Sequence, residues 1–440
     1  MCKLLEMFLT ATKGGMRNIF LILLLSSLLL NCKKETDLDP VISFISPSGQ
    51  ILLLAGDSIQ VEADVSDDRS LTSISLQLFY MNEVPASSAV VYQPQNNSFH
   101  ISTLYHVNNT LLESGHYLLT ITASDGKNKT RLAREIEIQA LPVERLKVFA
   151  ITASTSNVFI LELDSLHGQT LFKNLNGDYL SSSLSSRHQR LNILGKNSGL
   201  FTVLDSKNGS IVNEISGLCP IGNQCFEHLH FQDELNFISY HDGQVKAYDA
   251  DGLQQFEIEE DGYFRPNALY RLGNYLVAEI LYLNPPVRKI GVFFYPSGVQ
   301  ALEAALDMNI ISIFSKSDDE VFLFGHSNGL AVVEIFDLRI NRTSPLRTLG
   351  NMSIHSVYQF QSEEFYIATD QGLWNYKVNL GAFTQSTTIP TQRVDYDPIM
   401  NEIFLVEGNT IKVLDAGTSL EKKQYSLADS VLNIHFLYNK

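Results

Sequence analysis

The sequence predicts an all-β protein with two domains, a small β-sandwich followed by a larger ring of repeated four-stranded sheets. Three observations lead to this prediction. The chain has 440 residues, which is too long for one ordinary domain. β-branched and aromatic residues, among them 25 Phe and 18 Tyr, dominate its apolar runs, and extended helical periodicity is nearly absent. From about Phe149 onward, a two-strand pattern returns every forty-odd residues.

The N-terminal segment predicts export. Met16 and Arg17 form a positively charged start, and the apolar run IFLILLLSSLLLN follows them. This run is too short for a typical membrane-spanning helix, whereas its length suits the apolar core of a secretion signal. Met16 is therefore a candidate for the real start of the protein.

The apolar run ends in LLNC, and KKETD follows it. This segment resembles a bacterial lipoprotein signal, although Asn31 departs from the usual small residue, as it does in the looser signals of Bacteroidetes. The stretch after Cys32 also resembles the tags that send their lipoproteins to the cell surface. The resemblance implies a signal peptide over residues 1–31, a lipidated Cys32 and a tether over residues 32–40. The protein would then be an outer-membrane lipoprotein of the cell envelope, either periplasmic or surface-exposed. The alternative is an ordinary cleaved signal with an incidental cysteine.

The charge of the chain argues against a nucleic-acid partner. The formal net charge is -16 at pH 7, and the pI is about 5.1. Nucleic-acid binding rests on basic patches that release counterions from the phosphate backbone. We therefore expect no nucleic acid among the partners.

Residues 41–141 show short strands of alternating polarity separated by turn residues, which is typical of a β-sandwich. The segment ESGHYLLTITASDG resembles the penultimate strand of bacterial immunoglobulin-like and polycystic-kidney-type repeats. The resemblance implies an immunoglobulin-like β-sandwich that acts as a spacer, with Tyr117 as the corner tyrosine whose hydroxyl bonds back to the backbone. Seven strands are expected, at Ile42–Ile45, Ser58–Val65, Ser73–Tyr80, Ala89–Tyr92, Ser98–Thr103, Tyr117–Ser124 and Leu132–Ile138.

Acidic residues follow two of these strands, and their loops would meet at one end of the sandwich. Asp67, Asp68 and Asp125 are calcium candidates there, because hard cations take clustered carboxylate oxygens. The alternative is a solvated acidic loop with turn-forming Asp. We favour the second interpretation, because no calcium loop with fixed ligand spacing is present, and we predict no metal site.

Residues 142–440 contain seven related hairpins. A period of roughly 40 to 45 residues with four short strands per unit is typical of a β-propeller, so seven units imply seven blades. The last strand, Val431–Tyr438, has no hairpin after it, and the first unit begins without a full set of strands. We therefore expect a seven-bladed β-propeller closed by the C-terminal strand. The hairpins end at or near Asp164, Asp205, Asp249, Pro296, Asp337, Lys377 and Asp415.

The resemblance to known propellers is architectural. The Trp-Asp pair of WD repeats is missing, and the single tryptophan, Trp374, argues against the tryptophan-docked blades of quinoprotein dehydrogenases. The nearest similarity is to the seven-bladed propellers with YVTN-type or quinoprotein-amine-dehydrogenase-like repeats, found in many bacterial surface proteins. Because propellers host enzymes and pure binding proteins alike, this similarity does not decide the function.

One hairpin carries a sequence that matches a catalytic motif. Gly325-His326-Ser327-Asn328-Gly329 has the G-x-S-x-G pattern of a hydrolase nucleophile elbow. That chemistry needs the serine on a strained turn from a strand to a helix. Here strands flank the motif on both sides, and Asn328-Gly329 is a favoured hairpin turn. We interpret it as a turn and predict no catalytic residue.

Cys219 and Cys225 are the cysteines expected beyond Cys32 in the mature chain. An oxidising compartment favours a disulfide between them. The alternative is a zinc site that also uses His228 and His230, which would point to one face of a strand.

The loops between blades and those inside the second hairpin of each blade share one face of a propeller. Exposed aromatic and arginine side chains anchor interfaces or stack on sugar rings, so we expect this face to bind a ligand. The alternative for Phe264 is burial at a blade seam, and for Arg265 a place in the channel. The candidate ligand residues are Tyr263, Phe264, Arg265, His241, Asp242, His326 and Asp370.

We therefore predict a non-enzymatic cell-envelope lipoprotein whose propeller binds a protein or glycan, with no cofactor and with its oligomeric state open. The alternative is a propeller enzyme, a lyase or hydrolase acting on extracellular polysaccharide or peptide, and a third option is a structural module. An enzyme should show titratable groups with shifted pKa values converging in a concave pocket. A binding protein should show an exposed aromatic patch.

Overall fold

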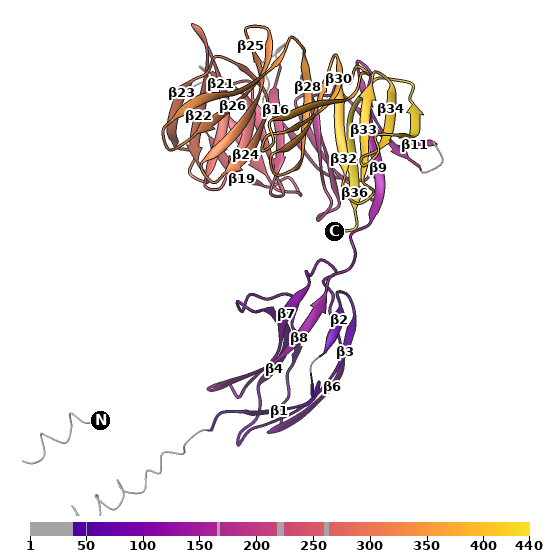
Figure 1. The fold of residues 1–440 in the computed structure, drawn as a ribbon. Coiled ribbons are helices and arrows are strands. Elements are labelled where there is room, and N and C mark those ends of the chain that lie inside the picture. Colours follow the sequence, from indigo (N-terminus) through magenta and orange to yellow (C-terminus); the bar gives the residue numbers. More distant parts are fainter. Residues whose placement is uncertain (1–37, 50, 165–167, 218–223, 259–263) are drawn as a thin grey trace, which may run out of the picture. The chain divides into compact units, whose positions relative to one another are not determined.

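In the computed structural model, every regular element among the described residues is a β-strand (Figure 1). Among these residues no helix is long and apolar enough to cross a membrane. The all-β prediction is confirmed for the part that the structure describes. The described residues are 38–49, 51–164, 168–217, 224–258 and 264–440.

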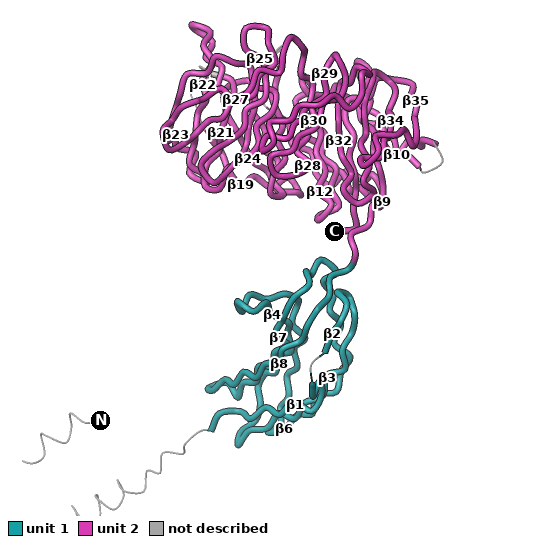
Figure 2. Tube along the Cα trace, viewed as in Figure 1, with its two compact units in different colours: residues 1–141 teal, residues 142–440 magenta. Residues whose placement is uncertain are grey.

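Several predictions from the sequence concern residues outside the described ranges. These are the signal peptide over residues 1–31, the lipidated Cys32, Cys219 of the disulfide, and Tyr263 of the ligand face. The chain divides into two compact units, residues 1–141 and 142–440 (Figure 2).

Unit 1 consists of two sheets, with strand orders β1-β3-β6 and β2-β8-β7-β4-β5. Both sheets alternate in burial, and their inward residues form one common core, in which Val61 and Val65 of β3 meet Leu76 of β4 and Ile121 of β7. The strands are β1 (Val41–Ser46), β2 (Leu52–Leu54), β3 (Ser58–Ser66), β4 (Ser73–Tyr80), β5 (Val90–Tyr92), β6 (Ser98–His106), β7 (Gly115–Ser124) and β8 (Lys129–Gln139).

Eight strands are present in the described part of unit 1, where the sequence predicts seven. The additional strand is β2, which pairs in parallel with β8. It is only three residues long, and its sequence Leu-Leu-Leu has no alternation of polarity that would reveal a strand. The predicted bond from Tyr117 back to the backbone is present, because the Tyr117 hydroxyl donates to the carbonyl oxygen of Glu113 at 2.8 Å.

The described part of unit 2 forms seven four-stranded antiparallel sheets, numbered here 1 to 7 along the chain. Sheet 1 has the order β36-β9-β10-β11, and the other six are consecutive meanders. The strands are β9 (Arg145–Ala153), β10 (Asn157–Leu163), β11 (Gln169–Asn176) and β36 (Val431–Tyr438) in sheet 1; β12 (Ser181–Ser185), β13 (Arg190–Leu194), β14 (Leu200–Asp205) and β15 (Ile211–Ser216) in sheet 2; β16 (Phe226–Gln232), β17 (Leu235–Tyr240), β18 (Val245–Tyr248) and β19 (Gln254–Ile258) in sheet 3; β20 (Phe264–Leu272), β21 (Tyr275–Leu283), β22 (Pro286–Phe294) and β23 (Gln300–Ala305) in sheet 4; β24 (Asn309–Ser317), β25 (Glu320–Ser327), β26 (Leu330–Asp337) and β27 (Arg342–Gly350) in sheet 5; β28 (Ile354–Gln361), β29 (Glu364–Thr369), β30 (Gly372–Lys377) and β31 (Ala382–Thr387) in sheet 6; and β32 (Arg393–Asp397), β33 (Glu402–Glu407), β34 (Thr410–Asp415) and β35 (Glu421–Ser426) in sheet 7.

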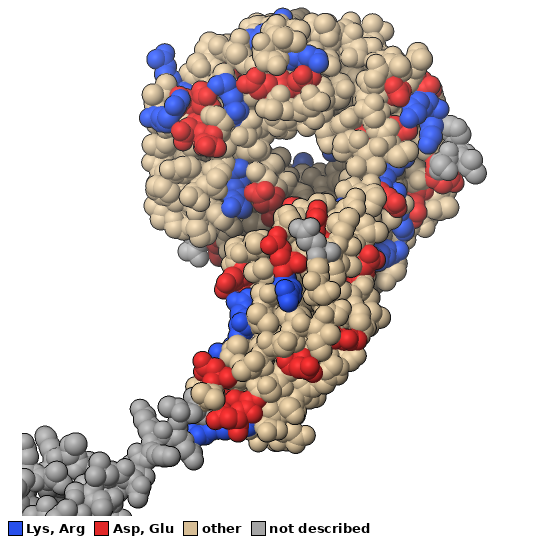
Figure 3. Space-filling model, turned by 60° about the horizontal axis from the view of Figure 1, so that its bottom comes forward, with Lys and Arg blue, Asp and Glu red and all other residues tan. Residues whose placement is uncertain are grey.

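The innermost strands of the seven sheets form a closed ring. They are called first strands below, and in sheet 1 the first strand is β36. β12, β16, β20, β24, β28 and β32 each contact the next in this series, and β36 contacts both β32 and β12. Figure 3 shows the central opening that this ring encloses. Apolar cores lie between neighbouring sheets, as where Val277 of sheet 4 packs with Leu323 and Phe336 of sheet 5. The arrangement is that of a β-propeller-like ring, in which each sheet buries its faces against its neighbours.

The C-terminal strand completes sheet 1, as the sequence predicts. β36 pairs antiparallel with β9, with Ile434 opposite Ala150 and His435 opposite Phe149. This pairing joins the last segment of the chain to the first strand of unit 2. It removes the open edge that either strand would otherwise present.

The hairpin with the G-x-S-x-G sequence is a turn between two strands. Asn328 and Gly329 adopt positive φ angles of 51° and 79°, as a two-residue hairpin turn requires. Position 325 requires glycine for a different reason, because a Cβ there would lie 2.0 Å from the carbonyl oxygen of Asn309 on β24. The two glycines are explained by strand geometry, and Ser327 ends β25 rather than beginning a helix.

Candidate functional site

The ring encloses a cavity of about 700 Å³ that the first strand of every sheet helps to line. This volume is in the range of small-molecule sites. Each first strand begins at the end of the ring where the turns between second and third strands also lie, because consecutive strands are antiparallel. That end is called the loop end below, and it is the face on which the sequence places the ligand candidates.

A polar wall, formed by β12, β32 and β36, lines one side of the cavity, and Ser182 is at its centre. The Ser182 hydroxyl lies 2.8 Å from the Tyr179 hydroxyl and 2.7 Å from Nε2 of His435. The Asn433 amide donates to the same hydroxyl at 3.0 Å. Ser182 is 8% exposed and Asn433 4% exposed, so these bonds form in a place that water barely reaches. Low exposure strengthens such a network and fixes its side chains.

The same wall carries one ion pair. Nε of Arg393 donates to Oδ2 of Asp395 at 2.7 Å, and Nη2 donates to Oδ1 at 3.1 Å. This side-on geometry holds the guanidinium in one orientation. Burial opposes the charge of Arg393, but the Asp395 carboxylate outweighs burial and raises the pKa of Arg393. In the described part of the chain, Nη1 of Arg393 has no hydrogen-bond partner.

The cavity also contains histidines that are held neutral. Burial lowers the pKa of His228 to about 3, and the neighbouring His230 adds to this effect. Burial likewise lowers the pKa of His435 to about 3, with a further contribution from Arg393. The pKa of His230 is also lowered by burial, and its Nε2 lies 3.1 Å from Oε1 of Gln232. At neutral pH these imidazoles carry no charge.

The opposite side of the cavity is apolar. β20 and β24 contribute Leu269, Ile313 and Phe314, and Phe231 of β16 completes it. Phe436 of β36 also lines the cavity, on the strand that forms part of the polar wall. Phe314 is fixed from behind by Phe324, with ring centroids 5.8 Å apart at 82°. A ligand in the cavity would therefore meet aromatic faces on one side and hydrogen-bonding groups on the other.

A second polar group lies at the loop end, on sheets 3 and 4. Nδ1 of His241 lies 2.5 Å from Oε1 of Glu227, and Nε2 lies 2.7 Å from Nη2 of Arg265. Because a guanidinium only donates, Nε2 accepts and the proton of the imidazole is on Nδ1. Two of the residues predicted for the ligand face, His241 and Arg265, are thus in direct contact.

The other predicted ligand residues organise turns and seams. Nε2 of His326 accepts the backbone N–H of Ile354 at 2.9 Å, and Oδ1 of Asp370 accepts that of Ser353 at 2.8 Å. Oδ1 of Asp242 accepts the N–H of Gln244 within its own turn. His326 and Asp370 therefore both bind the backbone at the start of sheet 6, whereas His241 and Arg265 belong to sheets 3 and 4. Phe264 begins β20.

The disulfide and metal predictions are only partly covered by the described residues. Cys225 is 4% exposed and disulfide-bonded.

The calcium candidates lie in unit 1. Oδ1 of Asp125 accepts the backbone N–H groups of Lys127 and Asn128 at 2.7 and 2.6 Å, which is the geometry of a turn-forming Asp. Burial raises the pKa of Asp67, and Asp68 and Asp125 add to the rise. Within the described ranges, no three His, Cys, Asp or Glu side chains are grouped to hold a metal ion.

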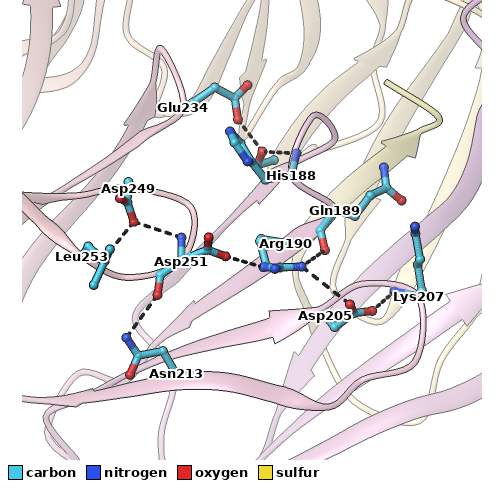
Figure 4. Close-up of polar contacts among 11 residues, drawn as sticks. His188, Gln189, Arg190, Asp205, Lys207, Asn213, Glu234, Asp249, Asp251 and Leu253 are labelled. Atoms are coloured by element: carbon cyan, nitrogen blue, oxygen red, sulfur yellow. Dashed lines mark hydrogen bonds and ion pairs between the residues drawn. The ribbon is translucent and has the colours of Figure 1, made fainter. Parts of the chain in front are cut away.

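A smaller cavity of about 350 Å³ lies between turns at the end of the ring opposite the loop end. Figure 4 shows the acidic side chains around it. Nε of Arg190 donates to Oδ1 of Asp251 at 2.9 Å, and Oδ1 of Asp249 accepts the N–H of Leu253 at 2.9 Å. The Ser185 hydroxyl donates to Glu234. These carboxylates hold turns in place, so the cavity is a product of turn geometry.

The comparisons with known proteins concern the fold. No family model matches the chain, and no curated protein matches it. A crystal structure of AztD from Citrobacter koseri is 12% identical, with a TM-score of 0.47, over 67% of this chain and 98% of that chain. Sqt1 from Saccharomyces cerevisiae is 15% identical, with a TM-score of 0.46, over 66% of this chain and 89% of that chain. Both are propeller-like folds, and at these identities and scores they carry no argument about function.

Apart from His228 and His230, which the sequence suggests only for the alternative zinc site, the cavity residues were not among the candidates from the sequence, although a signal for them exists. Polar residues interrupt otherwise apolar first strands, as Asn433 and His435 do in SVLNIHFLYN and His228 and His230 do in FEHLHFQ. Reading these interruptions requires knowing which strand of each repeat lies innermost. That assignment follows once β36 is placed inside sheet 1.

Proposed function

We propose that the chain is a cell-envelope lipoprotein that binds a glycan inside a propeller. In this proposal Cys32 carries the lipid anchor, residues 41–141 are an immunoglobulin-like spacer, and residues 142–440 are a seven-bladed β-propeller. The seven four-stranded sheets and the closure by β36 support the propeller. The common core of two sheets and the bond from Tyr117 to Glu113 support the spacer.

The direction of the pKa shifts favours binding over catalysis. Titratable groups do converge in the cavity, but a general acid or base works best with a pKa near the operating pH. The pKa of His228 and of His435 falls to about 3, and burial raises that of Tyr358 to about 12. All three shifts lead away from neutrality. In the described part of the chain, Nδ1 of His435 has no carboxylate partner, so the pair with Ser182 lacks the orienting group of a catalytic triad.

The observation that supports a glycan ligand is that the polar wall and aromatic side chains line the same cavity. Sugar hydroxyls both donate and accept hydrogen bonds, and the wall offers His435 and Arg393 in orientations that Ser182 and Asp395 fix. Aromatic rings such as Phe314 face the same cavity. Ligand sites of this kind combine apolar surface with a few placed polar groups.

Binding of the full-length protein to a glycan array tests this proposal. A blocking variant, Ser312→Trp, places a large ring among the cavity residues, whereas Ser317→Trp changes an exposed residue of the same strand. We expect the first variant to lose the signal and the second to keep it, with both folded by circular dichroism. Absence of glycan binding, or turnover of any glycan or peptide by the wild type, would overturn the proposal.

A further inference from the structure

We propose that the saccharide recognised in the channel is uncharged, and that acidic sugars are excluded from it. This inference rests on the proposed function and adds the chemical class of the ligand. It is carried by the charges and the hydrogen-bonding groups of the cavity.

The cavity has no net charge to offer an anion. Among the described residues that line it, Arg393 and Asp395 are the only ones of the Asp, Glu, Lys and Arg types. They neutralise each other through two hydrogen bonds, at 2.7 and 3.1 Å. A carboxylated ligand would have to share Arg393 with Asp395, which is 7% exposed. Leaving either carboxylate without a full partner at such low exposure is costly.

Three of the four described histidines that line the cavity, His228, His230 and His435, do not replace the missing cation. His228 and His230 lie two residues apart on β16, and protonation of one is opposed by burial and by the other. His435 faces Arg393, whose charge likewise opposes protonation. A neutral imidazole has one donor and one acceptor nitrogen. Its acceptor nitrogen repels a carboxylate but accepts a sugar hydroxyl.

Side-chain groups without hydrogen-bond partners lie on several sides of the cavity, where they can bind the hydroxyls of a sugar. In the described part of the chain, the side chains of His228 and Tyr358 have no hydrogen-bond partner, and neither has Nη1 of Arg393. They come from β16, β28 and β32, so they surround a ligand rather than lying on one side of it. Together they supply donors and acceptors, whereas a carboxylate can use donors alone. The charge of the whole chain, -16, also disfavours an approaching anion.

Calorimetric titration of the full-length protein tests the inference. The probes are uncharged oligosaccharides that score on the array and their uronate-containing counterparts of the same linkage. We expect the acidic counterpart to bind at least about tenfold more weakly, because its charge is not compensated. We also expect the affinity for the uncharged probe to change by less than about twofold between 50 and 500 mM NaCl, because no net charge is screened.

Three variants refine the test. Tyr358→Phe removes a hydroxyl that lines the cavity and should weaken binding roughly two- to tenfold, the loss of one hydrogen bond. Tyr275→Phe removes a hydroxyl outside the cavity lining and should leave the affinity unchanged. The double variant Arg393→Gln with Asp395→Asn removes both charges together, and we expect it to keep its preference for the uncharged probe.

The outcomes separate the two proposals. Equal or tighter binding of the uronate probe, or a strong loss of affinity with salt, overturns the inference while glycan binding stands. Failure of every probe to bind overturns both. Unchanged affinity in Tyr358→Phe shows that the ligand lies elsewhere on the ring and also overturns the inference.

Discussion

Nη1 of Arg145 lies 2.6 Å from Oδ2 of Asp397, which joins the first strand of unit 2 to sheet 7 across the closing seam of the ring. The same Nη1 lies 2.8 Å from Oε2 of Glu402, and the Tyr438 hydroxyl of β36 donates to Asp397 at 3.0 Å. The side chains of Asp397 and Glu402 are 0% and 2% exposed. Four strands, β9, β32, β33 and β36, thus share one buried ionic network that joins the two ends of unit 2.

Replacing Arg145 should strongly destabilise unit 2. Arg145→Ala leaves Asp397 without its cation, and breaking a buried ion pair in this way costs about 3–5 kcal/mol. Chemical denaturation followed by circular dichroism measures the loss. The exposed Arg339, which pairs with Asp337, is a matched control, and Arg339→Ala should leave the midpoint unchanged. Similar small effects of both variants would contradict the role of the seam.

Removing the C-terminal strand should open the ring. A chain ending at Asp429 lacks β36, so β9 keeps only β10 as a partner. The loss of Val431 and Ile434 also exposes the rest of the apolar core between sheets 7 and 1. We expect this chain to lose the cooperative unfolding transition of unit 2 and to aggregate through the open edges. A truncated chain that melts at the temperature of the full protein would show that closure is dispensable.

The repeat in the sequence predicts the ring because local and global signals agree in it. Turn residues with positive φ, such as Asn328 and Gly329, recur in step with the apolar strands, so each hairpin reports both its own geometry and the period. The short strand β2 carries neither signal. Its three leucines are placed by pairing with β8, which is a tertiary contact.

The candidate site was less accessible from the sequence because its members are distant in the chain. Ser182 and His435 are 253 positions apart and meet only because the ring closes. The loop-face residues are easier to notice, since loops carry exposed polar and aromatic groups. Of these, His241 and Arg265 do come together, whereas His326 serves the seam with Ile354.

The hydroxyl of Tyr117 should stabilise unit 1. Tyr117→Phe removes the hydroxyl that donates to Glu113 at 2.8 Å and leaves that carbonyl oxygen without this partner. The expected cost is about 1 kcal/mol. Thermal unfolding should show the loss in the transition of unit 1, with that of unit 2 unchanged. Tyr92→Phe is the control, because the Tyr92 ring packs on Phe99 and the change removes only its hydroxyl.

The G-x-S-x-G sequence allows a direct separation of a structural from a catalytic role. Gly325→Ala places a Cβ 2.0 Å from the Asn309 carbonyl oxygen, so β24 must move and the expected cost is about 1–3 kcal/mol. Ser327→Ala removes the hydroxyl that a nucleophile elbow would need, and stability should stay within about 0.5 kcal/mol. Equilibrium unfolding of both variants measures this. Reversal of the two effects would contradict the turn interpretation.

The neutral histidines should make the ring sensitive to acid. Both His228 and His435 titrate near 6.5 when unfolded and near 3 in the folded ring, so the folded state excludes protons that the unfolded state binds. Stability is therefore fully present above about pH 6.5 and falls as the pH is lowered toward 3. Between pH 7 and 5 the loss is about 1–2 kcal/mol per histidine. His435→Gln should reduce this pH dependence by about one histidine's share, whereas a change at the exposed His188, His188→Gln, should not. Denaturation midpoints measured at several pH values test this, and equal slopes for the wild type and His435→Gln would show that His435 is protonated in the folded ring.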